Sequence, residues 1–89
     1  MKYRKKPVIV EAWQYLGGIS IASPQWVQDA WSDRKLYFSG KKLFVRSWES
    51  DMLVSPNDYV IKGVMGELYP CKPVAFRETY EPVREGKRA

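Results

Sequence analysis

The chain of 89 residues has no histidine and a single cysteine, Cys71. An intramolecular disulfide needs two cysteines, and a structural zinc site draws its ligands mainly from cysteine and histidine, so neither is expected. The chain also has no glycine-rich phosphate-binding loop, no apolar run near the ~18 residues of a membrane span, and no apolar signal-peptide core. We therefore expect a cytoplasmic protein with no cofactor, no metal and no membrane contact.

Negative charge is scarce in the N-terminal half. Up to Ser47, nine Lys and Arg face three acids, a net charge of +6, whereas from Trp48 onward six face seven, a net charge of −1, which together give +5. A positive field of this kind attracts polyanions or an acidic protein surface. Ordinary solubilising charge on a small domain is the alternative interpretation.

Short β-branched and aromatic runs alternate with glycine or proline turns, which is typical of an α+β domain. We expect strands over residues 7–15, 36–38, 43–45, 52–54, 59–62 and 67–69. Ser23 as N-cap and Pro24 at the first position predict a helix that runs to about Trp31, and Pro73 begins a short C-terminal helix. The prediction is a mainly antiparallel sheet of about five or six short strands with one packed helix. Residues 1–83 form one domain in this prediction, and 84–89 a charged, disordered tail.

Aromatic residues make up 15% of the chain, with four Trp, six Tyr and three Phe. Each ring buries roughly 150–250 Å², so we expect large rings to carry the core of a domain this small. The predicted core rings are Trp13, Trp26, Tyr59, Tyr69 and Phe76. In the first helix, Trp26 and Trp31 are expected to pack on the sheet together with the small side chains between them.

Two blocks at the ends of the chain share a distinctive pattern: MKYRKKPVIVEAWQY, and NDYVIKGVMGELYPCKPVAFRETYEPV. They resemble a family of small bacteriophage and prophage proteins with a Pro-Gly-Asp-Tyr turn, a Gly-Val-x-Gly-Glu-x-Tyr-Pro hairpin and a Phe-x-x-Thr-Tyr-Glu helix. Asn57 stands where that family usually has Gly, and Val74 where an Asp is common. The resemblance implies a phage origin and an accessory role in the host bacterial cell, and it brings no activity with it.

Few residues are candidates for catalysis. Cys71 precedes a helix and neighbours a lysine, a setting that can activate a thiol, but the chain lacks the histidine base that a catalytic cysteine normally uses. We interpret Cys71 as a packing residue. Among the acids, Asp58 is expected to bond the backbone of its own turn, and Glu11 to be the partly buried one. No catalytic residue is assigned, and the protein is not expected to be an enzyme.

The central hairpin is the candidate partner-binding site, because it interleaves cations with rings. Its residues are Arg34, Lys35, Tyr37, Lys41, Lys42, Phe44, Arg46 and Trp48. Such a surface is typical of protein interfaces and also of single-stranded nucleic-acid binding. The favoured hypothesis is stoichiometric binding to a host protein or protein complex, with inhibition of a host defence complex as one form of it. The alternatives are weak, sequence-tolerant nucleic-acid binding and binding or sequestering of a small ligand.

Overall fold

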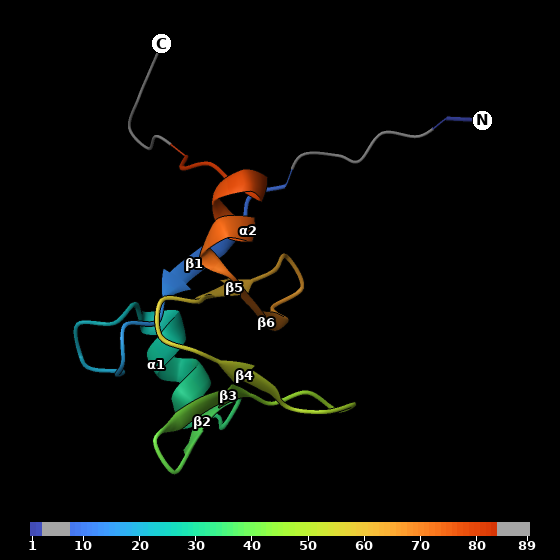
Figure 1. The fold of residues 1–89 in the computed structure, drawn as a ribbon. Helices are drawn as coiled ribbons and strands as arrows, with labels where there is room; N and C mark the ends of the chain where they lie inside the picture. The colour runs from blue at the N-terminus through green and yellow to red at the C-terminus, as the bar shows by residue number, and fades with distance from the viewer. Residues whose placement is uncertain (3–7, 84–89) are drawn as a thin grey trace.

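The computed structural model describes residues 1–2 and 8–83, which form two three-stranded antiparallel sheets and two helices (Figure 1). The first sheet has the order β1-β5-β6 and the second the order β2-β3-β4. Their strands are β1 (Glu11–Gln14), β5 (Tyr59–Lys62), β6 (Leu68–Cys71), β2 (Leu36–Ser39), β3 (Lys42–Val45) and β4 (Met52–Val54). The helices are α1 (Gln25–Ser32) and α2 (Pro73–Thr79). The α+β class is confirmed, whereas the prediction of one sheet is wrong.

The division into two sheets is set at the turn from Ser55 to Asp58. The backbone N–H of Tyr15 donates to the Asp58 carbonyl at 2.8 Å, and the N–H of Asn57 donates to the Tyr15 carbonyl at 2.6 Å. These bonds hold the turn against the end of β1, so β5 leaves the turn alongside β1 rather than alongside β4. β6 then lies near β3 and β4 and brings the two sheets together.

Aliphatic side chains, rather than rings, fill the core between the sheets and α1. Fully buried side chains are Val27, Leu36, Leu43, Val45, Val54, Val60 and Ile61. Tyr15 is the one buried ring among the described residues. All five rings predicted for the core are half-buried, and Trp31 is 51% exposed. The two small sheets and the eight-residue α1 enclose an aliphatic cluster together with Tyr15, and Trp13 and Trp26 pack against the outside of that cluster.

Helix α1 positions the candidate hairpin through its C-terminal end. Pro24 is the N-cap rather than the first helical residue, and the Ser23 hydroxyl accepts from the Ser20 N–H at 3.1 Å instead of capping the helix. At the other end, Arg34 has a φ of 64°, and the Lys35 N–H reaches back to the Ala30 carbonyl at 2.8 Å. This Schellman-type ending turns the chain directly into β2.

The turn before β5 has the chemistry that its residues predict. Pro56 precedes Asn57, whose φ of 81° lies in the left-handed region, and the Asp58 N–H donates to the Ser55 carbonyl at 2.9 Å. Asp58 is 3% exposed; its carboxylate accepts from the Ser55 N–H at 3.0 Å and pairs with Lys72 at 3.0 Å. The prediction that Asp58 bonds its own turn is confirmed, and Lys72 ties this turn to the start of α2.

Substitution of Asn57 tests this turn. Asn57→Ala is expected to lower the free energy of unfolding by about 1 kcal/mol, because a Cβ without a local hydrogen-bonding group is strained at positive φ. Asn57→Gly is the control and is expected to retain full stability, since glycine adopts this conformation freely. Urea denaturation of the two variants measures the difference. Equal loss in both would mean that the asparagine side chain, not its backbone conformation, matters.

The conformation of the hairpin between β5 and β6 also follows from its residue types. Gly63 donates its N–H to the Glu67 carbonyl at 2.8 Å, and Gly66 has a φ of 85°. The Glu67 side chain folds back over Gly63, where an added Cβ would lie 2.0 Å from a carboxylate oxygen, and it accepts from the Met65 N–H at 3.0 Å. The two glycines and the glutamate of the motif therefore form one compact turn.

Helix α2 lies next to β1 and β5 of the first sheet (Figure 1), and aromatic contacts hold it there. The Phe76 ring stacks on Tyr59 with a centroid distance of 3.8 Å and an interplanar angle of 10°, and it lies 5.2 Å from Tyr80. The hydroxyls of Tyr69 and Tyr80 are 3.2 Å apart. That hydrogen bond, together with partial burial, raises the pKa of Tyr69 from 10.0 to about 12.

Within the described residues, no helix has the length and apolar character that crossing a bilayer requires. The predicted tail, 84–89, and most of the basic segment from Lys2 to Lys6 lie outside the described part of the chain.

Candidate functional site

The second sheet has one buried face and one open face. Leu36, Leu43, Val45 and Val54 point into the core and are at most 1% exposed. Because side chains alternate along a strand, their neighbours lie on the opposite face. There Tyr37 pairs with Phe44, and Phe44 with Leu53, in one row across the three strands. We call the outward-pointing residues Tyr37, Lys42, Phe44, Arg46 and Leu53 the hairpin face.

The rings and the arginine of the hairpin face contact one another. Tyr37 and Phe44 are stacked, with centroids 5.6 Å apart and planes inclined by 16°. The guanidinium of Arg46 lies 5.1 Å from the centroid of the Tyr37 ring, within the range of a cation–π interaction. The Arg46 Nε–H also donates to the Arg34 carbonyl at 2.9 Å. Arg46 is therefore held over Tyr37 by contacts with the chain at the start of β2.

Asp51 joins this arrangement, although no sequence pattern singles it out. The Tyr37 hydroxyl donates to one carboxylate oxygen of Asp51, and the Ser47 N–H donates to the other at 3.0 Å. The hydrogen bonds that Asp51 accepts from Tyr37 and from Ser47 lower the pKa of its carboxyl. The hydrogen bond between Tyr37 and Asp51 also raises the pKa of Tyr37. Only the pairing of β3 with β4 brings Asp51 next to the tyrosine, so composition and spacing could not reveal it.

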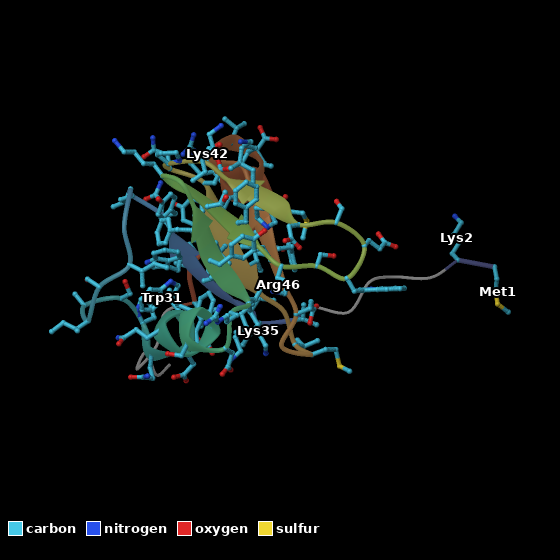
Figure 2. The ribbon with its side chains drawn as sticks, turned by 90° about the horizontal axis from the view of Figure 1, so that it is seen from below. Met1, Lys2, Trp31, Lys35, Lys42 and Arg46 are labelled. Carbon is cyan, nitrogen blue, oxygen red and sulfur yellow. The ribbon has the colours of Figure 1, made fainter. Side chains whose placement is uncertain are left out.

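The remaining predicted cations are spread along the hairpin. Figure 2 shows Lys35 and Arg46 at one end of it and Lys42 at the other. Lys41 lies in the turn beside Gly40, outside the row of rings, and is exposed. Lys72 forms an ion pair with Asp58. Among residues 1–2 and 8–83, Lys35, Lys42 and Arg46 have no carboxylate at ion-pair distance, although the positive charge of Arg46 helps to lower the pKa of Asp51.

Trp48 is separate from the stacked rings. It lies in the loop between β3 and β4 and is 95% exposed. The structure thus brings together Tyr37, Phe44, Arg46 and the Arg34 carbonyl, and leaves Trp48 and Lys41 apart from them. Leu53, which is 45% exposed and extends the ring row by one strand, was not predicted.

The other residues considered as catalytic or metal-binding candidates, Cys71 and the acidic residues, do not form a reactive group among the described residues. Cys71 is half-buried, and burial, reinforced by the negative charge of Asp58, raises the pKa of its thiol. A thiol with a raised pKa is a poor nucleophile near neutral pH. Glu11 is exposed, so the prediction that it is partly buried is wrong; its strand lies at the outer edge of the first sheet. Within the described ranges, no group of three or more Cys, Asp or Glu side chains is placed to hold a metal ion.

Comparison of the chain with protein-family models, with curated proteins and with solved structures gives no match.

Proposed function

We propose that this protein acts by stoichiometric binding to an acidic surface of a host protein, with the hairpin face as the contact. The observation that carries the proposal is an open sheet face on which stacked rings are bordered by Lys42 and Arg46. Neither cation forms an ion pair among the described residues, and Arg46 interacts with Asp51 only at longer range. Arginine and aromatic side chains are the residues that most often carry binding energy at protein interfaces. Cations of this kind add long-range attraction, which raises the association rate toward a negatively charged partner.

The resemblance to small phage proteins supports a partner in a bacterial host, and inhibition of a host defence complex is the proposed biological form of the binding. Structural roles account for several residues of the resembling block, including Asp58, Gly63, Glu67 and Phe76. The hairpin face lies outside that block. The two resembling blocks would then form the scaffold, and the hairpin between them would form the partner-specific surface. That division of roles suits an accessory factor.

Nucleic-acid binding is the weaker alternative. Single-stranded nucleic acids stack their bases on free ring faces. On the hairpin face, the Tyr37 ring is stacked with Phe44, and the Arg46 guanidinium lies over it. Little of the Tyr37 ring is therefore available for stacking with a base. The cations alone would support weak, salt-dependent attachment to phosphates.

Charge reversal on the hairpin face tests the proposal. The double variant Lys42→Glu/Arg46→Glu is expected to slow association with the partner about tenfold or more at low salt, because steering contributes at least that factor. The protein is purified with its partner from producing bacterial cells, with and without nuclease, and the bound proteins are identified by mass spectrometry. The association rate with the recovered partner is then measured at several salt concentrations.

Arg77→Glu is the matched control, since Arg77 is exposed on α2, away from the hairpin. It is expected to recover the same partner at a nearly unchanged rate. Nuclease-sensitive recovery of many proteins would favour the nucleic-acid alternative. Full association of a correctly folded double variant would show that the hairpin face is not the contact.

A further inference from the structure

A groove of about 370 Å³ lies beside the hairpin face, between loops that belong to the two different sheets. One wall comes from the loop after β3, which carries Trp48, and the other from the β5–β6 loop, which carries Met65. In Figure 1 both loops project to the right of the molecule. Half-buried Met52 and Leu68 line the same groove.

The apolar side chains at this groove are unusually open. Trp48 is 95% exposed and Met65 is 87% exposed. Single exposed apolar residues are common on protein surfaces, but two that line one concave site indicate an interaction surface. Methionine is flexible and polarisable, so Met52 and Met65 can adapt to the shape of an inserted side chain. Tryptophan is among the residues most enriched at binding hot spots.

The charged residues at the groove indicate the charge that a bound partner segment should carry. Lys35 and Arg46 line it, and neither forms an ion pair within the described ranges, although the charge of Arg46 also acts on Asp51. The one acid of the groove, Glu67, is turned toward its own loop, where it accepts from the Met65 N–H at 3.0 Å. A second copy of this chain would present the same cations to Lys35 and Arg46, so charge favours a partner segment of opposite sign.

We propose that this groove binds a large apolar side chain presented by an acidic segment of the partner protein. The proposal rests on the proposed function and names the chemistry of the partner: an aromatic or long aliphatic residue flanked by Asp or Glu. The anchor enters between Trp48 and Met65, and its acidic neighbours reach Lys35 and Arg46. The groove adjoins the hairpin face through Arg46, so one acidic partner can contact both surfaces.

The test uses a defined peptide, acetyl-Asp-Glu-Asp-Phe-Asp-Glu-Asp-amide, and the indole N–H and methyl signals of the isotope-labelled protein in NMR. The expected result is a saturable shift of the Trp48 indole and Met65 methyl signals. The same peptide with Ser in place of Phe, and a version with Lys in place of every acid, are each expected to bind at least about fivefold more weakly. Trp48→Ala is expected to weaken binding of the Phe peptide about tenfold.

Trp31→Ala is the matched control, because Trp31 is also exposed but lies on α1, outside this groove. It is expected to bind the peptide as the unchanged protein does, and a melting temperature for each variant confirms that it folds. The proposal is overturned if the Phe and Ser peptides bind equally, if Trp48→Ala has no effect, or if a short oligothymidylate shifts the Trp48 signal and the acidic peptide does not.

Failure of this proposal and failure of the proposed function have different signatures. Recovery of a host partner that depends on Lys42 and Arg46, without any peptide binding at Trp48, removes the groove proposal alone. Peptide binding at Trp48, without a nuclease-resistant partner in producing cells, leaves the groove as a binding site and removes the proposed function.

Discussion

Leu43→Ala is expected to lower the free energy of unfolding by about 2–5 kcal/mol, the usual range for truncating a leucine in a close-packed core. Leu43 is 0% exposed on the central strand of the second sheet, where it pairs with Val54 and belongs to the cluster shared by both sheets and α1. Small domains have a total stability of only about 5–15 kcal/mol, so this single change removes a large share of it. Urea or thermal denaturation, followed by circular dichroism, gives the measurement.

Leu53→Ala is the matched control for that experiment. Leu53 is the same residue type on the neighbouring strand, but it points to the opposite face and is 45% exposed. Its truncation is expected to cost less than about 1 kcal/mol, since an exposed side chain leaves no cavity. A comparable loss of stability in the two variants would contradict the assignment of the two sheet faces.

Local sequence chemistry predicts the individual elements well. Gly40 has a φ of 64° in the two-residue turn between β2 and β3, and Asn57 has a φ of 81° in the turn before β5. Both turns depend on which residue types tolerate the left-handed region, and that information is local. The six strands were likewise recognisable from β-branched and aromatic runs, although β1 is shorter than predicted.

Long-range pairing was not predictable in the same way. β4 and β5 follow one another in the chain and yet lie in different sheets, because the Ser55–Asp58 turn bonds to Tyr15. The same limitation explains the error in the core. Ring content suggests burial, but whether a ring lies inside depends on which faces meet, and here aliphatic faces of two small sheets meet around α1.

The candidate site shows the same division between local and distant information. The interleaving of rings and cations in one hairpin is a local pattern, and it is the reason that Tyr37, Phe44 and Arg46 are predicted as parts of one site. Alternation along the paired strands then explains why the three lie on one face. Asp51 and Leu53 join these residues because β4 pairs with β3. Met65, which lines the adjoining groove, comes from a loop of the other sheet. Their contribution requires the register and the arrangement of the sheets, neither of which residue spacing encodes.

Phe76→Ala is expected to release α2 from the first sheet and to lower the free energy of unfolding by about 2–3 kcal/mol. The expected loss is below the ~3–5 kcal/mol of a fully buried phenylalanine because Phe76 is half-buried. The ring stacks on Tyr59 at 3.8 Å and supports Tyr80 at 5.2 Å, so its removal eliminates contacts on both sides. Guanidinium denaturation at neutral pH measures the stability change.

The titration of Tyr69 provides a second, independent readout of the same variant. The hydrogen bond with Tyr80 is the main reason that the pKa of Tyr69 is raised from 10.0 to about 12. Because the folded-state pKa lies above the unfolded value, this stabilisation is present below about pH 10 and is lost as the pH rises from about 10 to about 12. Phe76→Ala displaces Tyr80, so we expect the pKa of Tyr69 to fall toward 10 and this pH dependence of stability to disappear.

Tyr80→Phe separates the hydrogen bond from the ring contacts. It keeps the ring beside Phe76 and removes the hydroxyl that bonds to Tyr69, so the pKa of Tyr69 should fall while neutral-pH stability drops by only about 1 kcal/mol. Tyrosinate absorbance across the alkaline range measures the titration in each variant. A Phe76→Ala protein whose Tyr69 still titrates near pH 12 would show that β6 and Tyr80 stay together without the stacked ring, and that Phe76 is not the residue that docks α2.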